Sequence, residues 1–390
     1  MSIIARIVSE TLPEYCRERG LSLDQLKACS ALTRCRSGEL GYLEGSCRCG
    51  YSQSFPASCR NRHCPACQAG AALRWVEQWR WKIPDVPTYH AVFTVPECLR
   101  VFFEFGRREC FDALFVAARK AIERMCAKNR RLAGAKPGMI AMLHTWGSQL
   151  QFHPHLHVIL CGAGYREDGA WVQLPASKGW LVPVRALSRC FRALMLEWLE
   201  GLLEAKEPVF GLPHAQAASL LRRAAMHRWR VFIQRSRRGP DRVLAYLGRY
   251  AHRVGISPKR ILGFKDGKVE IAFRGRGEKA AVRTCCLPGR EFVARFLQHV
   301  LPGGFRKIRA YGFLLRGGAP PEARAATVPL CPHCSVALVF VFRSNPLQVI
   351  KHCANSPPFV GFNAFGLKNR LPTKRGNELF PYNIETPFST

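Results

Sequence analysis

The chain is 390 residues long, with 48% hydrophobic and 11% aromatic residues, which excludes a disordered protein and allows two or three domains with ordinary cores. Its 59 lysines and arginines against 27 acidic residues give a formal net charge of +32. Such an excess favours a polyanionic partner, usually nucleic acid, and the dominance of arginine suits phosphate contacts. A basic ribosome-associated or membrane-surface protein remains the alternative on composition alone.

The chain contains 18 cysteines, and its first residues, MSIIARIVSETLPEYC, lack the basic region and long apolar run of a secretory signal. Cysteines in a protein that is not exported indicate reduced thiols and metal sites rather than disulfides. The longest apolar runs, such as VALVFVF at 336–342, are far shorter than the roughly 20 residues that span a bilayer. We therefore expect a cytoplasmic protein without a membrane span.

The predicted elements begin after a segment rich in cysteines and turn residues, 1–75. A strand is expected in PTYHAVFTVP from residue 87, and an apolar-periodic helix over roughly 98–130. Two more strands follow, in MIAMLHTW at 139–146 and QFHPHLHVIL at 151–160. They are close enough in sequence to lie side by side in an antiparallel sheet.

Helices and one hairpin are predicted in the second half of the chain. Residues 184–206 have the apolar spacing of a core helix, and a basic helical tract is expected from 214 to about 254, with a break at Gly239-Pro240. ILGFKDGKVEIAF predicts a hairpin that turns at Asp266-Gly267, and GREFVARFLQHVLPGGF predicts a helix stopped by Pro302-Gly303. The mixture indicates an α+β fold with a central antiparallel sheet flanked by helices.

The cysteines of SCRCGYSQSFPASCRNRHCPACQ, residues 46–68, predict a structural zinc site. Cys47 and Cys49 form one knuckle, and Cys64 and Cys67 form a second one after 14 intervening residues. This spacing is close to that of a tetrahedral site of four thiolates. Two further ligand types, Cys59 and His63, lie between the knuckles and are alternative ligands. A site closed by four thiolates leaves no open position for catalysis.

Three histidines at alternate positions, His153, His155 and His157, point to the same face of the predicted strand and predict a metal site. Neutral imidazoles accept many divalent ions, so the residue type does not select one. Two histidines and one further polar side chain leave positions open for a phosphate oxygen, as a Mg²⁺ or Mn²⁺ nuclease requires. Besides His153, candidates for the third ligand are Gln149, Gln151 and His90.

A tyrosine pair lies in VLAYLGRYAHRVGIS, residues 243–257. Tyr246 and Tyr250 are four residues apart and share one face of a helix. Arg242, Arg249 and Arg253 surround them, and they are predicted to contact DNA. A phenol oxygen can attack a phosphodiester and conserve the bond energy as a phosphotyrosine, so cleavage and rejoining need no ATP. A packing stripe is the alternative reading of the pair.

A second zinc ribbon is a further hypothesis, at Cys331 and Cys334, with His352-Cys353 after a gap.

The motifs SCRNRHCPACQ, HAVFTVP, HPHLHVIL and YLGRYAHRVGIS occur in the same order as in a known family. The histidine strand followed by a tyrosine-bearing helix resembles the HUH endonucleases. The wider pattern, over roughly residues 25–335, resembles the transposases of insertion sequence 91 and their common-region relatives.

This resemblance implies rolling-circle transposition by a bacterial, DNA-associated enzyme that nicks and rejoins single-stranded DNA at element ends. His155 and His157 would bind a catalytic Mg²⁺ or Mn²⁺, and Tyr250 and Tyr246 would be the nucleophiles. The expected domains are a zinc-binding DNA-binding domain (1–75), an HUH catalytic domain (85–280), a C-terminal helical or zinc-ribbon-like region (281–345) and an irregular tail (346–390).

Two classes compete with this hypothesis. A plasmid replication initiator or relaxase would use the same chemistry, and the N-terminal zinc block favours the transposase over both. A non-catalytic zinc DNA-binding regulator would explain the charge and the cysteines, but neither the histidine strand nor the tyrosine pair. Single-stranded DNA and element-end DNA are the expected partners, and the sequence does not determine the oligomeric state.

Overall fold

The computed structural model describes residues 2–132, 134–175, 182–205, 211–236, 239–251, 255–275, 281–315, 330–336 and 338–343. Contacts divide the chain into a unit that ends at Asn345 and the remainder, 346–390, which lies outside the described residues together with His352 and Cys353. None of the helices in the described ranges is long and apolar enough to cross a bilayer.

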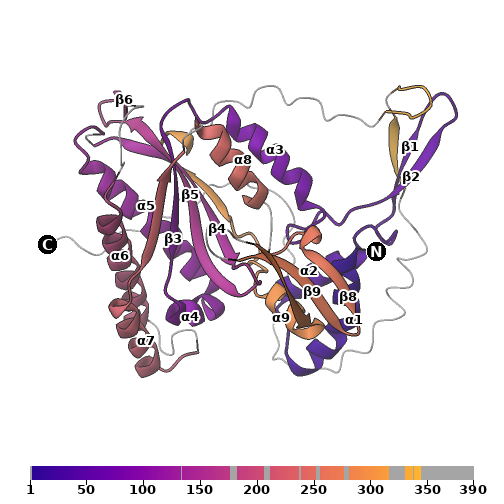
Figure 1. Ribbon diagram of the computed structural model, residues 1–390, viewed down its shortest axis with the longest axis horizontal. Helices are drawn as coiled ribbons and strands as arrows, with labels where there is room; N and C mark the ends of the chain where they lie inside the picture. Colours follow the sequence, from indigo (N-terminus) through magenta and orange to yellow (C-terminus); the bar gives the residue numbers. More distant parts are fainter. Residues whose placement is uncertain are drawn as a thin grey trace, which may run out of the picture. The chain divides into compact units, whose positions relative to one another are not determined.

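A six-stranded antiparallel sheet forms the centre of the fold (Figure 1). Its strands run in the order β11, β4, β5, β3 and β7, with β6 paired to β5. Their bounds are Ile308–Tyr311, Lys136–Trp146, Phe152–Tyr165, Thr88–Thr94, Arg230–Arg235 and, for β6, Trp171–Gln173. The predicted α+β class with a central antiparallel sheet is therefore confirmed, as is the antiparallel pairing of the two predicted strands β4 and β5.

Helices cover both faces of this sheet. On one face, Phe93, Leu156 and Val158 pack against Phe111 and Phe191 in a large core. This side is covered by α4 (Arg100–Phe105), α5 (Arg107–Ala127), α6 (Val184–Ala205) and α7 (His214–Met226), with a short 3-10 turn, η1 (Glu97–Leu99), before α4. The predicted helix over 98–130 is thus broken at Gly106, whereas the helix predicted over 184–206 is confirmed as α6.

The opposite face is covered by two helices, α3 (Gln68–Arg80) and α8 (Gly239–Ala251). Trp75 of α3 and Val243, Leu244 and Leu247 of α8 form a separate core with Ile140, Met142 and Ile159 of the sheet. The basic tract predicted as helical from 214 to 254 is therefore wrong between α7 and α8, where β7 forms the edge strand. In its sequence, RVFIQR, exposed side chains alternate with half-buried or buried ones, because only one side of the strand faces the large core.

A second sheet lies in the part of the chain that follows α8. It consists of β8 (Ile261–Lys265), β9 (Lys268–Arg274) and β10 (Val282–Pro288), and the turn η2 (Pro258–Arg260) precedes it. The predicted hairpin is confirmed as β8 and β9, with Asp266 and Gly267 both at positive φ (49° and 69°), as a tight hairpin turn requires. The predicted helix after it is α9, but it ends at Leu297, before Pro302.

The second sheet shares its core with the N-terminus of the chain. Ile4 and Ile7 of α1 (Ile3–Glu18) and Leu32 of α2 (Leu23–Arg34) are buried with Ile271 and Phe292. Residues expected in an N-terminal domain therefore pack against residues of the expected catalytic and C-terminal regions. The division into domains at 75, 85 and 280 stays a prediction.

A third, small sheet joins segments that are almost 300 residues apart in sequence. The hairpin of β1 (Tyr42–Ser46) and β2 (Ser52–Pro56) gains β12 (Val339–Arg343) as its third strand, in the order β12, β1, β2. All pairings are antiparallel, with Tyr42 opposite Arg343. The short η3 (Gly312–Leu315) follows β11 on the central sheet.

A buried histidine connects α9 to the loop between β4 and β5. His299 is fully buried, and its Nε2 donates to the carbonyl oxygen of Leu150 at 3.0 Å. Its Nδ1 then accepts from the hydroxyl of Thr145 at 3.1 Å. Burial lowers the pKa of His299 to about 3, because the charged ring would lose its hydration. The neutral imidazole of His299 therefore holds the end of β4 in place.

We expect this histidine to make stability depend on pH. The unfolded chain takes up a proton near pH 6.5 and folded His299 only near pH 3, so the free energy of unfolding falls as the pH drops through this window. By pH 5 the loss amounts to about 2 kcal/mol from this residue. Urea unfolding at pH 7 and pH 5 should show a correspondingly smaller difference for His299→Gln. The exposed His214→Gln is the control, and an equal pH effect in both variants would contradict the assignment.

Close packing of α3 on α8 depends on a glycine. A Cβ at Gly248 would overlap the side chain of Val76, a stiff β-branched residue that cannot move aside easily. We predict that Gly248→Ala lowers the free energy of unfolding by about 1–3 kcal/mol, the usual cost of overpacking.

Gly201, on the exposed side of α6, has nothing within 4 Å of its Cβ position and is the matched control. Gly201→Ala should raise stability by about 0.5–1 kcal/mol through helix propensity. Equal responses of the two alanine variants in chemical unfolding would contradict the proposed close contact.

Candidate metal centres and active-site cavity

Three imidazoles gather on the sheet face that also carries α8. His155 and His157 occupy alternate positions of β5 and so point to the same side. His144 of β4 is the direct cross-strand partner of His155. The ligand nitrogens of the three residues all lie within 4.8 Å of one another. The register of two neighbouring strands thus builds a group that the β5 sequence alone supplies only in part.

Hydrogen bonds orient two of these rings. The Nδ1 of His155 donates to the carbonyl oxygen of His153 at 2.7 Å, which leaves its Nε2 as the atom that faces the Nε2 of His157, at 3.1 Å. The Nδ1 of His157 lies 2.8 Å from the Nε2 of His90. Both rings thus turn Nε2 toward the centre while a neighbour binds the other nitrogen, as is usual for histidines that ligate a metal.

The three histidines fit a divalent ion. A cation about 2.1 Å from two nitrogens, with the ligands at right angles, separates these nitrogens by about 3.0 Å. The observed Nε2–Nε2 distance is 3.1 Å. Burial lowers the pKa of His155 to about 4 and that of His157 and His144 well below its usual value, so the rings are neutral donors at pH 7.

His144 replaces His153 in the predicted group of three. The ring of His153 is tilted by 41° to that of His155, with the centroids 5.1 Å apart, and its backbone carbonyl rather than its imidazole orients His155. His90 contacts His157 from behind, and the Oε1 of Gln151 accepts from the backbone N–H of Gln149. The sequence signal for His144 was its place in a strand next to the histidine strand.

The histidines open into a cavity of about 540 Å³, which β9 and β10 line on the other side. Arg260 and Arg274 contribute positive charge to it. The guanidinium of Arg260 is held in place, since it donates to the carbonyl oxygens of Ala272 and Ser148. Trp146 stacks on His144 at 4.7 Å and also lines the cavity. Two cationic side chains thus face the cavity, of which Arg260 is held in place, and the sequence predicted neither.

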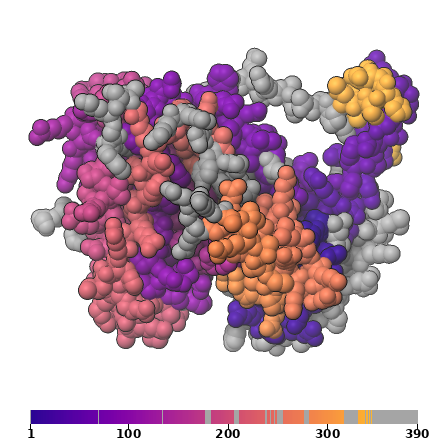
Figure 2. Space-filling model, in the orientation of Figure 1, coloured from indigo at the N-terminus to yellow at the C-terminus, as the bar shows by residue number. Residues whose placement is uncertain are grey.

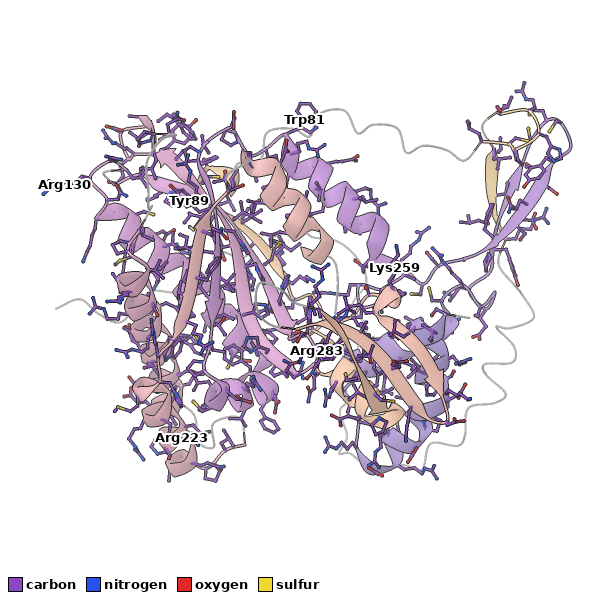
Figure 3. The ribbon with its side chains drawn as sticks, viewed as in Figure 1. Trp81, Tyr89, Arg130, Arg223, Lys259 and Arg283 are labelled. Carbon is purple, nitrogen blue, oxygen red and sulfur yellow. The ribbon has the colours of Figure 1, made fainter. Side chains whose placement is uncertain are left out.

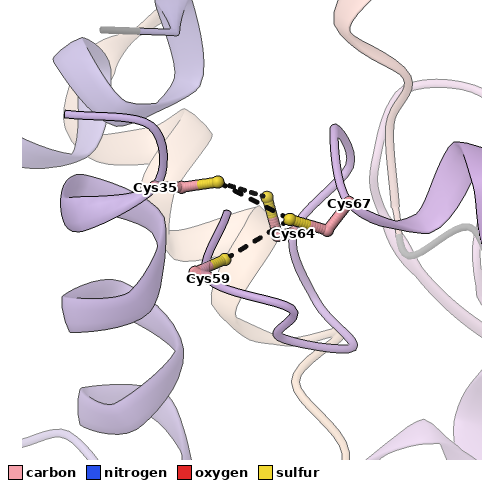
Figure 4. A group of neighbouring side chains, drawn as sticks. All are labelled: Cys35, Cys59, Cys64 and Cys67. Atoms are coloured by element: carbon pink, nitrogen blue, oxygen red, sulfur yellow. Dashed lines mark hydrogen bonds between the residues drawn. The ribbon is translucent and has the colours of Figure 1, made fainter. Parts of the chain in front are cut away.

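The first of two cysteine groups joins the end of α2 to the start of α3. Figure 4 shows Cys35, Cys59, Cys64 and Cys67 with their sulfur atoms turned toward one another. Sulfur–sulfur distances of 3.6 Å and 3.7 Å match the edge of about 3.8 Å expected for four thiolates that surround zinc at about 2.3 Å. Hydrogen bonding from Cys59 lowers the pKa of the Cys64 thiol to about 5, which favours a thiolate in the group.

The second cysteine group lies on the three-stranded sheet. Cys47 and Cys49 at the tip of the β1–β2 hairpin meet Cys331 and Cys334, which precede β12. The Sγ atoms of Cys47 and Cys334 are 3.3 Å apart, and those of Cys49 and Cys331 are 3.6 Å apart. This group also has the donor set and the compactness of a zinc site.

The cysteine pairs predicted to form one site thus belong to two different groups, and this corrects the predicted ligand set. Cys59, predicted as an alternative, joins Cys64 and Cys67, whereas His63 does not join them. The Nε2 of His63 instead accepts the backbone N–H of Leu301 at 3.1 Å, and burial lowers its pKa to about 3. Cys35 was not predicted, because it lies 24 residues before Cys59 with no neighbouring cysteine to form a knuckle.

The predicted tyrosine helix exists as α8. Tyr246, Tyr250, Arg242 and Arg249 are all in it, but their side chains lie outside the described residues, as does the whole of Arg253. The backbone of α8 packs on the same sheet face as the histidines through its buried leucines. The helix and the histidine group are therefore on one side of the sheet.

Comparison with known proteins gives matches over most of the chain. Residues 7–95 match the family described as transposase zinc-binding domain, and residues 138–320 match the family described as putative transposase. The chain is 38% identical over 307 residues to the putative transposase y4qJ of Sinorhizobium fredii, which covers 75% of each chain. It is 30% identical over 307 residues to the transposase for insertion sequence element IS801 of Pseudomonas savastanoi pv. phaseolicola, which covers 76% of this chain and 72% of the relative. No solved structure matches the chain.

The order of these matches follows the two kinds of site found in the structure. The zinc-binding match contains the whole group of Cys35, Cys59, Cys64 and Cys67, and the transposase match contains all three clustered histidines and α8. Together with the relatives that align over three quarters of its length, they show that the chain belongs to the family of insertion sequence 91 and IS801 transposases and has the N-terminal zinc-binding domain of that family.

Proposed function

We propose that this transposase nicks and rejoins single-stranded DNA at element ends through a phosphotyrosine, with an active site of the HUH type. His144, His155 and His157 would hold the catalytic Mg²⁺ or Mn²⁺, and Tyr250 would be the first nucleophile. The observation that carries the proposal is the course of α8, whose last turn comes level with the histidines.

The start of α8 is fixed at the far end of the sheet from the histidines. Gly239 lies beside Asp85, and Asp241 forms an ion pair of 3.1 Å with Arg80 at the end of α3. The preceding strand, β7, has Arg235 opposite Tyr89, which in turn is opposite Leu160 of β5. The helix therefore begins near the level of Leu160.

From there α8 runs back toward the histidines. Its 13 residues span about 20 Å, and the six residues of β5 from Leu160 to His155 span about 17 Å over five steps. Beyond the helix, the Cβ position of Gly255 is 3.2 Å from Leu150 in the β4–β5 loop. The start of α8 near Leu160 and the position of Gly255 beside Leu150 thus both support the inference that α8 ends near His155.

This direction favours Tyr250 over Tyr246. Tyr250 is the last residue but one of α8 and stands five positions before Gly255. Tyr246 lies one turn earlier, about 6 Å farther back along the helix axis. Tyr250 can therefore attack first, and Tyr246 remains available for a later transfer.

The reaction needs little more than positioning. The phenol oxygen of Tyr250 attacks phosphorus and loses its proton, and the bond to one neighbouring sugar oxygen breaks as that oxygen gains a proton. The reverse attack by a strand end restores the diester and frees the tyrosine. A divalent cation, when bound, would polarise the phosphate, and Arg260 together with Arg242, Arg249 and Arg253 would neutralise its charge.

Membership of a transposase family favours this function over a plasmid initiator or relaxase with the same chemistry. A non-catalytic regulator is the alternative that chemistry can test directly. It would bind DNA and zinc but form no covalent product.

Incubation with a labelled single-stranded oligonucleotide from an element end and Mn²⁺ should produce a covalent protein–DNA adduct. We expect Tyr250→Phe to reduce it by roughly three orders of magnitude or more, because Phe keeps the ring but lacks the attacking oxygen. His144→Gln should abolish it as thoroughly as His155→Gln. The measurement is adduct yield against time on a denaturing gel.

Tyr89→Phe and His153→Gln serve as the matched controls, since neither is in the proposed set. Adduct formation at wild-type rate by the Tyr246→Phe, Tyr250→Phe double variant would contradict the tyrosine mechanism. A full loss in His153→Gln with activity retained in His144→Gln would overturn the ligand assignment.

The two cysteine groups predict two structural zinc ions in each chain. Because a zinc site contributes its binding energy to folding, the ions should leave together with local structure when a strong chelator is added. Elemental analysis of wild-type protein should find about two zinc atoms per chain, and of Cys35→Ser or Cys331→Ser about one.

The exposed Cys286→Ser, outside both groups, should keep both ions. A single zinc in the wild-type protein that is lost from Cys35→Ser and retained in Cys331→Ser would exclude the second site.

A further inference from the structure

A groove of about 1150 Å³ runs along the edge strand β7 and the first turns of α6. Thr94 and Val92 form part of its floor, and the sheet register sets them directly opposite His155 and His157. Adjacent strands are only about 5 Å apart, so this groove adjoins the histidine group. Figure 1 shows the sheet edge next to α6 on which it lies.

The groove is lined by arginines from two elements. Arg185, Arg189 and Arg192 of α6 are spaced four and three residues apart and share one helix face, while Arg230 begins β7 and Arg228 directly precedes that strand. None of the five forms an ion pair with a residue in the described ranges, and no acidic residue lines the groove. Their charge is therefore available to an external anion.

Without a bound anion, the position of these arginines destabilises the folded protein. The first turn of α6 contains Arg185 and no acidic residue, although the exposed N–H groups of a helix start make that end positive. The repulsion among the five guanidinium groups adds to this unfavourable electrostatic energy. A bound polyanion would remove both costs, because helix starts and arginine both bind phosphate oxygens.

An exposed aromatic side chain on β7 favours single-stranded over double-stranded nucleic acid as the partner. Phe232 of β7 lines the groove and is 51% exposed, so it presents a large apolar surface among the arginines of the groove. Its ring meets that of His90 edge-on at 6.4 Å, so it stands beside the histidine group. A basic track with an exposed aromatic ring is the usual arrangement of a site for single-stranded nucleic acid, where bases stack and phosphates follow the cations.

We propose that this arginine groove holds the single-stranded DNA segment that leads into the histidine cavity, with Phe232 stacking on a base. The inference rests on the proposed function for the identity of the strand. It adds a binding path on the β7 side of the site, whereas Arg260 and Arg274 lie on the other side. Figure 2 shows the molecule as a space-filling model in the orientation of Figure 1.

The test compares two triple variants of the full chain with the same loss of charge. One is Arg185→Gln, Arg189→Gln, Arg230→Gln. The other is Lys128→Gln, Arg130→Gln, Arg131→Gln, in the segment after α5, where Arg130 projects outward in Figure 3. Fluorescence anisotropy with a labelled oligothymidylate is measured between 50 and about 300 mM salt, a range in which phosphate contacts dominate affinity.

Each lost phosphate contact lowers the slope of log K against log[salt] by about 0.7 for single strands, so the groove variant should lose about 2 from its slope. The control variant should keep the wild-type slope. Phe232→Ala should weaken binding about fivefold or more with the slope unchanged, and Phe232→Trp should restore it. A duplex of equal length should be insensitive to Phe232→Ala.

Equal slopes in the two triple variants would overturn the groove, as would an unchanged affinity of Phe232→Ala. Equal effects of all variants on duplex and single strand would show that the surface binds duplex instead, which also overturns it. Adduct formation at saturating DNA is measured in parallel. If the wild-type protein forms no adduct, the proposed function fails, whereas the groove is decided by the binding data alone.

Discussion

The register between β4 and β5 sets the position of every group at the histidine centre. His144 stands opposite His155, Met142 opposite His157, and Ile140 opposite Ile159, all on one face. Because side chains alternate along a strand, a slip of β5 by one residue would turn His155, His157 and Ile159 to the other face, away from His144. The same alternation sends Leu156 and Val158 into the large core on the opposite side. Burial of that core therefore holds the histidines where they are.

The first cysteine group also constrains the helices that cover the histidine face. Cys67 immediately precedes α3, so the first cysteine group fixes the start of that helix. α3 in turn contacts α8 where Gly248 permits a close approach, and an ion pair between Arg80 and Asp241 joins their other ends. A structural metal at the cysteines would thus stabilise, through two packed helices, the element that carries the proposed nucleophile.

Seven arginines lie on the two sides of the histidine group. The cavity beside the histidines has Arg260 and Arg274 on one side, and the groove along β7 has five arginines on the other. In the folded protein this arrangement is repulsive, and a net charge of +32 makes it more so. The repulsion is consistent with a protein that functions while bound to a polyanion. Hydrogen bonds to two backbone carbonyl oxygens hold Arg260 in place beside the histidines.

Local patterns in the sequence were sufficient for features that depend on near neighbours. Short β-rich or apolar runs predicted β3, β4 and β5. The alternation of side chains along a strand predicted the shared direction of His155 and His157, apolar spacing predicted α6, and the Asp266-Gly267 pair predicted the hairpin of β8 and β9. β7 left only the short apolar run VFI within RVFIQR, and the basic residues around it suggested a continued helix. The order of the quoted motifs was also sufficient to indicate the family.

Only the tertiary structure decided which distant residues meet. His144 joins the histidines because two strands pair, Cys35 completes a group that begins 24 residues later, and Cys331 and Cys334 reach Cys47 and Cys49 across most of the chain. Sequence spacing cannot rank such partners, because closing a longer loop costs only slightly more entropy than closing a short one. Which cysteines meet is set instead by the packing of α1, α2 and α9 and by the pairing of β12 with β1, neither of which leaves a periodic trace in the sequence.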